Sequence, residues 1–221
     1  MTLRNVLDFR SPPRLADRAL PAPLNPRMQR IVSELRRNIE LKARLRDPAG
    51  ARVAAESLAD RPVELQSQCD TYFNCPHGRL KLREIEGRTA QLIWYDRADR
   101  AEAKGSDYRL VDVADGQGLL AALTAAMGVR SVVRKRRRIY WHRNVRIHLD
   151  EVGEAGNFLE FEAVLSDPAD ESASRQLVDE LARRFNLKSD DLLRGSYGDM
   201  LARSVALRVP APRIVESPSG R

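Results

Sequence analysis

The stretch "RRNIELKARLRD", residues 36–47, alternates polar and apolar side chains. Every second position is polar or charged: Asn38, Glu40, Lys42 and Arg44. Successive side chains of a β-strand point to opposite faces, so this pattern predicts a strand with acid and base together on one face and an apolar opposite face. Whether the charged face meets water or the inside of a closed sheet decides the fold.

The same alternation recurs along the chain. We expect eight strands, near residues 37–46, 63–73, 79–86, 89–97, 106–113, 131–141, 144–151 and 157–165. The segments 74–78, 86–88 and 142–144 are short enough for hairpins, which predicts antiparallel neighbours. Turn and capping residues predict three helices, near 49–59, 116–127 and 168–185. The last helix carries an apolar stripe, so we expect it to pack on an apolar surface.

Charge and proline are concentrated at the ends of the 221-residue chain. The net charge is +7, but residues 1–37 contribute +5, which leaves the body nearly balanced and argues against a large basic patch for nucleic acid. We therefore expect a Pro/Arg-rich disordered extension over 1–36, one folded domain over 37–205 and a disordered tail over 206–221. The sequence shows no membrane helix and no secretory signal, so we expect a cytoplasmic protein.

Two folds fit this pattern. In an open antiparallel sheet the charged face lies in water and helices cover the apolar face. In a closed barrel the charged face turns inward, where burying both signs costs several kcal/mol per ion unless a partner is present. A metal-bound polyanion supplies that partner, because Lys and Arg hold phosphate and carboxylates hold a hard cation. Carboxylate ligands favour Mg²⁺ or Mn²⁺.

One strand leaves its orientation open. In "VVRKRRRIY" two basic side chains lie on one face, Lys135 and Arg137, and three lie on the other, Arg134, Arg136 and Arg138. Alternation alone does not say which face carries the function.

A family resemblance bears on these choices. "NIELKARL" at 38–45 resembles the opening strand of the CYTH superfamily, the triphosphate tunnel metalloenzymes, whose signature there is Glu-x-Glu-x-Lys. Similar segments follow in order at 68–73, 78–84, 92–97, 106–111, 132–140, 145–152, 156–162 and 196–201. The succession is most similar to the branch labelled class IV adenylyl cyclase.

The resemblance implies an α+β fold, an eight-stranded antiparallel closed β-barrel that forms a triphosphate tunnel with helices packed outside. It implies that four carboxylates bind metal: Glu40, Glu160, Glu162 and Asp150. It implies that six cations bind the triphosphate: Lys42, Lys81, Arg83, Arg97, Lys135 and Arg137. Lys42 and Glu40 would act in catalysis. The chain departs from the signature at Asn38, which replaces the first Glu and puts a two-metal mechanism in doubt.

The activity implied is a Mg²⁺- or Mn²⁺-dependent conversion of ATP to cyclic AMP and pyrophosphate. The alternative is a tripolyphosphatase or another organic triphosphatase, such as a thiamine triphosphatase, since both reactions need the same grip on phosphate. Tyr108 and His148 are candidates for contact with adenine. A non-enzymatic polyphosphate- or RNA-binding module explains the basic residues but not the acidic ones, so nucleic acid is not the expected partner. A homodimer is a further hypothesis.

Overall fold

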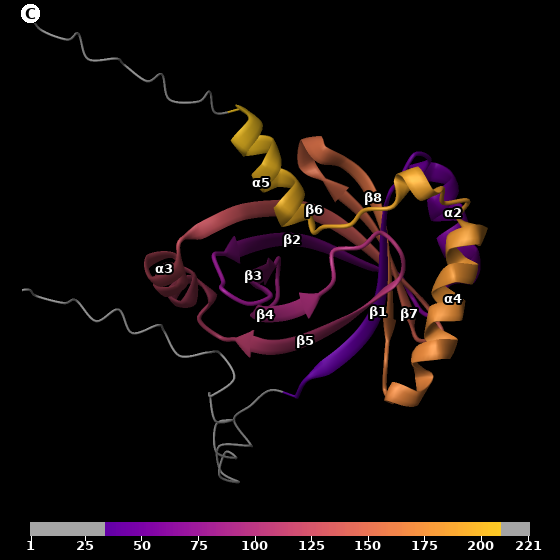
Figure 1. The fold of residues 1–221 in the computed structure, drawn as a ribbon, viewed down its shortest axis with the longest axis horizontal. Helices are drawn as coiled ribbons and strands as arrows, with labels where there is room; N and C mark the ends of the chain where they lie inside the picture. The colour runs from indigo at the N-terminus through magenta and orange to yellow at the C-terminus, as the bar shows by residue number, and fades with distance from the viewer. Residues whose placement is uncertain (1–33, 209–221) are drawn as a thin grey trace, which may run out of the picture. The chain divides into compact units, whose positions relative to one another are not determined.

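Eight strands pair edge to edge into a closed barrel in the computed structural model, which describes residues 34–208 (Figure 1). They are β1 (Arg36–Arg44), β2 (Glu64–Phe73), β3 (Arg79–Ile85), β4 (Ala90–Arg97), β5 (Lys104–Val113), β6 (Val129–His142), β7 (Val145–Val152) and β8 (Gly156–Val164). Their order around the barrel is β1-β5-β4-β3-β2-β6-β7-β8, and every neighbouring pair is antiparallel. The closed antiparallel barrel is therefore confirmed.

The strand boundaries follow the alternation closely. The largest differences are of two residues: β1 ends at Arg44 and β5 and β6 begin at Lys104 and Val129, whereas we expected an end near 46 and starts near 106 and 131. The three short segments join β2 to β3, β3 to β4 and β6 to β7, and each of these pairs is hydrogen-bonded as expected for hairpins. Most of the predicted tails, residues 1–33 and 209–221, lies outside the described residues.

The described part of the chain also contains helices α2 (Pro48–Leu58), α3 (Gly116–Met127), α4 (Glu171–Arg184) and α5 (Tyr197–Arg208), with single turns η2 (Gly153–Ala155), η3 (Pro168–Asp170) and η4 (Ser189–Asp191). The carboxylates of Asp47 and Asp115 cap the first turns of α2 and α3. The helix expected over 168–185 begins as the turn η3 and becomes α-helical at Glu171. Helix α5 was not among the helices expected.

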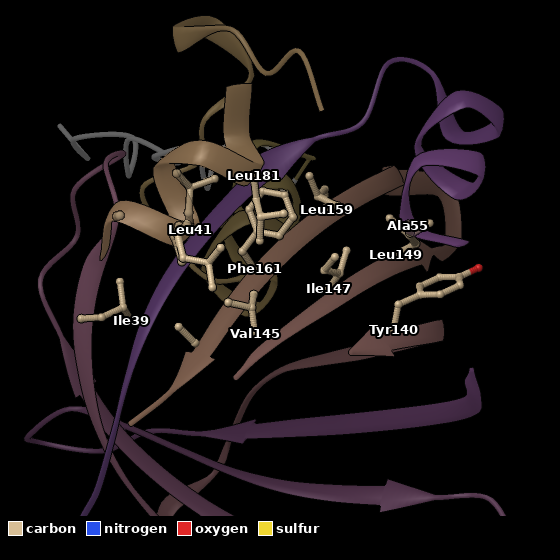
Figure 2. Packing of buried hydrophobic residues seen from close by; sticks show 14 of the residues in the cluster. Ile39, Leu41, Ala55, Tyr140, Val145, Ile147, Leu149, Leu159, Phe161 and Leu181 are labelled. Carbon is tan, nitrogen blue, oxygen red and sulfur yellow. The ribbon is translucent and has the colours of Figure 1, made fainter. Parts of the chain in front are cut away.

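The largest apolar core lies on the outer wall of the barrel. Ile39 and Leu41 of β1 point away from the interior and are buried with Phe161 of β8. Leu177, Val178 and Leu181 of α4 cover them, and Figure 2 shows Leu181 lying over Leu41 and Phe161. Burying one such side chain contributes about 1.5–3 kcal/mol. The predicted apolar stripe of the last long helix therefore packs on the apolar face of the sheet.

A second outer core forms under α3, from Phe73, Leu82 and Ala90 on β2, β3 and β4. Helices thus cover the apolar face from outside, and the charged face is left to line the barrel. This arrangement resolves the choice between the open sheet and the barrel. No helix in the described range 34–208 is long and apolar enough to span a membrane.

Candidate functional site

The inward faces of all eight strands line one cavity of about 330 Å³. Its walls carry lysines, arginines and carboxylates side by side. The volume lies at the lower end of the range for small-molecule sites.

The two ends of this tunnel differ. At one end the inward side chains are partly or fully exposed: Arg36, Glu64, Arg88 and Trp141. At the other end they are buried and pack together: Tyr72, Val133, Phe158 and Tyr197. The tunnel therefore opens at the end where β1 and β2 begin and is filled with side chains at the end where α5 begins.

All six cations expected to bind phosphate line the cavity: Lys42, Lys81, Arg83, Arg97, Lys135 and Arg137. Each of the six lies within ion-pair distance of a carboxylate. Lys42 Nζ lies 2.6 Å from Glu160 Oε1, and Arg97 Nη1 lies 2.8 Å from Glu40 Oε1. Arg136, between Lys135 and Arg137 on β6, lies on the outer face of the barrel with 76% of its side chain exposed. The structure thus selects the strand orientation that the family resemblance favoured.

Asp70 is a central member of the site that we did not assign. Its carboxylate has no exposed surface and lies 3.0 Å from Lys81 Nζ, 2.7 Å from Arg83 Nε and 3.3 Å from Lys135 Nζ. Burial alone raises the pKa of Asp70, but Arg83, Lys81 and Lys135 outweigh burial and hold that pKa well below its usual value. One carboxylate therefore holds three of the six cations together before any ligand arrives.

The two lysines that contact Asp70 have lowered pKa values. Burial, followed by repulsion from Arg83, lowers the pKa of Lys81 to about 8. Burial, followed by repulsion from Arg137, lowers the pKa of Lys135 to about 7. A bound polyanion favours the charged form of both, so binding draws protons onto the site.

Arg137 is held by two carboxylates and a tyrosine network. Its Nε and Nη2 donate to the two oxygens of Asp150 at 2.6 Å each, and Nη2 also donates to Glu160 Oε2 at 2.7 Å. Tyr197 Oη donates to Asp150 Oδ2 at 2.9 Å. Both oxygens of Asp150 are thus engaged, so this geometry favours an anchoring role for Asp150, whose expected metal role stays a prediction.

The other three predicted metal ligands lie on two neighbouring strands. Glu40 of β1 pairs in register with Glu162 of β8, and Lys42 pairs with Glu160, so the three carboxylates share one face. Glu162 accepts from Asn38 Nδ2 and lies 3.2 Å from Arg146 Nε. Each carboxylate thus faces a polar or cationic partner, and no three acidic, His or Cys side chains within residues 34–208 are gathered as a ready metal site.

Two buried oxygens on β1 nevertheless suit a divalent cation. Glu40 Oε1 accepts no hydrogen bond despite its close approach to Arg97, and Asn38 Oδ1 accepts none either. Amide and carboxylate oxygens are the ligands that Mg²⁺ and Mn²⁺ prefer. Asn38, Glu40 and Glu162 therefore fit a metal once the carboxylates turn from their ion pairs.

His148 lies between the acids of β8. Its Nδ1 is 3.4 Å from Glu160 Oε2 and its Nε2 is 3.8 Å from Glu162 Oε2. Burial, followed by repulsion from Arg137, lowers the pKa of His148 to about 4, so the imidazole is neutral near neutral pH. His148 and Tyr108 both line the cavity, as the adenine hypothesis requires of them.

Helix α5 brings Tyr197 into the tunnel. The Tyr197 ring lies 4.2 Å from Lys42 Nζ and 5.3 Å from Lys135 Nζ. The helix begins with reciprocal bonds in which Ser196 N–H donates to Asp199 and Asp199 N–H donates to Ser196 Oγ. The Ser-x-x-Asp spacing at 196–199 is a capping signature that could have predicted this helix.

The family pattern of the CYTH domain matches residues 36–197. The chain belongs to the CYTH domain family. Over 181 residues the chain is 28% identical to the adenylate cyclase CyaB of Aeromonas hydrophila, covering 76% of this chain and 91% of that protein.

Solved structures show the same CYTH fold. The PH1012 protein of Pyrococcus horikoshii OT3 is 27% identical, with a TM-score of 0.65 over 73% of this chain and 98% of that one. HpAC1 of Hippeastrum, described as having a dominant triphosphatase activity, is 17% identical, with a TM-score of 0.52 over 76% of this chain and 96% of that one. At that identity the second likeness supports the fold alone.

Proposed function

We propose that this CYTH protein is a divalent-metal-dependent enzyme that binds a triphosphate in its tunnel and converts ATP to cyclic AMP and pyrophosphate. Members of the family are adenylyl cyclase-like enzymes or triphosphatases. The observation that carries the proposal is the set of six cations that converge on one cavity with three carboxylates on its β1 and β8 wall. Cations alone suit any polyanion, but the acids need a metal to bind beside one.

In this reaction the ribose 3′-hydroxyl gives its proton to solvent and its oxygen bonds to the α-phosphorus. The bond from the α-phosphorus to the oxygen that bridges it to the β-phosphorus breaks, and that oxygen leaves as part of pyrophosphate. Charge grows on the departing pyrophosphate. Lys81, Arg83 and Lys135 meet at Asp70 and are placed to neutralise that charge. Arg137, fixed by Asp150, holds one phosphate in a single orientation.

Glu40 and Glu162 would hold the metal, with the amide oxygen of Asn38 as a neutral third donor. When bound, Mg²⁺ or Mn²⁺ neutralises phosphate oxygens and orients the chain of phosphates. Lys42, 2.6 Å from Glu160, lies beside this group and contacts the phosphates from the same wall. Glu40 and Lys42 are thus our catalytic candidates.

A triphosphatase is the second candidate, because the six cations that line the cavity suit hydrolysis of a bound triphosphate as well as its cyclisation. It would use the same cations but direct water at the terminal phosphorus. The test is to incubate the protein with ATP, tripolyphosphate or thiamine triphosphate and either Mg²⁺ or Mn²⁺, and to identify the products by chromatography. Cyclic AMP from ATP supports the cyclase, orthophosphate supports the triphosphatase, and no turnover of any substrate with either metal refutes both.

A further inference from the structure

The tunnel changes character between its charged middle and its open end. Four apolar side chains line this part of the cavity, one each from β3, β4, β5 and β6, and we call them the collar: Ile85, Ile93, Leu110 and Ile139. Two of them, Ile93 and Leu110, also pack against the deeper apolar cluster around Tyr72. Ile85 ends β3, and Leu110 and Ile139 lie near the ends of β5 and β6, at the end where the tunnel opens. Aliphatic side chains provide neither a charge nor a hydrogen-bond donor for phosphate, so the collar suits an apolar part of a ligand.

An unsatisfied amide oxygen lies beside this collar. Gln68 lines the cavity, is only 4% exposed, and pairs in register with Ile85. Its Oε1 atom is buried and has no hydrogen-bond partner among the described residues. A buried acceptor without a donor costs about 1–3 kcal/mol, which a ligand that donates to it recovers.

A chain of side chains fixes the direction in which Gln68 points its oxygen. The carboxylate of Glu64 can only accept hydrogen bonds, and it accepts one from Gln66 Nε2 at 3.3 Å. The oxygen of Gln66 then faces Gln68 and accepts from Gln68 Nε2. The carboxylate at the end of the chain therefore leaves Oε1 of Gln68 as the free group.

We propose that the collar and Gln68 form a subsite for a heteroaromatic base that presents an N–H donor, as the 6-amino group of adenine does. The collar contacts the faces of the ring, and Gln68 Oε1 accepts from its edge. The inference rests on the proposed function, since the phosphates of the same ligand occupy the cations deeper in the tunnel. It makes an organic triphosphate the substrate in preference to inorganic tripolyphosphate.

The nearest exposed aromatic group does not offer an alternative platform. Trp141 stands at the open end, but Arg61 lies 4.5 Å and Arg146 5.5 Å from its ring. Both guanidinium groups are within cation–π distance, so the Trp141 ring is already engaged by side chains of the protein. The base is therefore assigned to the collar, where Leu110 lies two residues from the adenine candidate Tyr108 on the inward face of β5.

The test measures dissociation constants by calorimetry for ATP, inosine triphosphate and tripolyphosphate, with Ca²⁺ in place of Mg²⁺ or Mn²⁺ and a check by chromatography that no ligand is turned over. Inosine triphosphate differs by a carbonyl in place of the 6-amino group. Burial of the ring should make ATP bind at least about tenfold tighter than tripolyphosphate. The bond to Gln68 should favour ATP over inosine triphosphate by about tenfold.

The Gln68→Leu variant should remove the difference between ATP and inosine triphosphate while tripolyphosphate binding stays within about twofold. Gln117→Leu, on the outside of α3 where Gln117 bonds Glu84, is the matched control and should change nothing. If the unmodified protein binds ATP and inosine triphosphate equally well, the subsite is wrong. This comparison does not depend on whether any variant folds. If tripolyphosphate binds as tightly as ATP, the subsite fails and the proposed function stands. If no triphosphate binds, both fail.

Discussion

Replacing Asp70 by Asn removes the carboxylate that holds Lys81, Arg83 and Lys135 together, with almost no change in shape. The carboxylate is fully buried and lies within 3.3 Å of all three cations. Removing one partner from a buried ion pair costs about 3–5 kcal/mol, because the remaining charge stays buried and unpaired. A protein of this size loses about 2–4 °C of Tm per kcal/mol, so we expect a fall of about 6–20 °C.

The loss should also depend on pH. Asp70 raises the pKa of Lys81 and of Lys135 in the folded protein. Without Asp70, the pKa of Lys81 falls below about 8 and that of Lys135 below about 7, whereas both lysines keep a pKa of about 10.4 in the unfolded state. The unfolded state then binds more protons than the folded state, and the stability of the variant rises with pH more steeply than that of the wild type. The destabilisation is therefore larger at about pH 6 than at about pH 9.

Thermal or urea unfolding monitored by circular dichroism measures both effects. Asp107→Asn is the matched control, because Asp107 forms an ion pair with Arg37 on the surface, where 41% of its side chain is exposed. That pair is worth about 1 kcal/mol or less. If Asp70→Asn costs no more than Asp107→Asn, or costs the same at both pH values, Asp70 does not organise the cations as described.

Three further predictions concern ligand binding. Tripolyphosphate affinity, measured by calorimetry, should fall as pH rises through about 7, because Lys135 loses its proton there in the free protein. Lys135→Arg should flatten this profile, and an affinity that falls as steeply in the variant contradicts the lowered pKa of Lys135. Arg137→Ala should weaken triphosphate binding by about 2–5 kcal/mol and Arg136→Ala hardly at all; equal effects would mean that the outer face of β6 also binds the ligand. Glu40→Gln should raise the Mg²⁺ or Mn²⁺ concentration needed for half-maximal turnover at least about tenfold, and an unchanged metal requirement would exclude Glu40 as a ligand.

Much of the fold could be predicted from the alternation of side chains. Ile39 and Leu41 had to share one face and Glu40 and Lys42 the other, and the structure keeps those faces apart. Alternation does not say which face is inside, because it fixes only the relation between neighbours. The closed barrel was therefore expected from the order of the segments and not from any one of them.

The members of the site were predictable only in part, and their pairings were not. The six phosphate-binding candidates line the cavity, and their role stays a prediction. The contacts of Asp70 depend on the register of β2 with β3 and β6, which local sequence does not encode. Tyr197 was missed for another reason. Its helix has no clear apolar stripe, and only the Ser-x-x-Asp cap at Ser196 indicates it in the sequence.

Because side chains fill the tunnel beside α5, a ligand that enters with its phosphates first has a single route in and out. If the proposed cyclisation takes place, its pyrophosphate would lie deeper in the tunnel than the cyclic nucleotide and could not leave before it. This imposes an order of product release, with the nucleotide leaving first. Such an order would make pyrophosphate a competitive inhibitor against the substrate and the cyclic nucleotide a noncompetitive one. This kinetic pattern follows from a tunnel that is open at one end only.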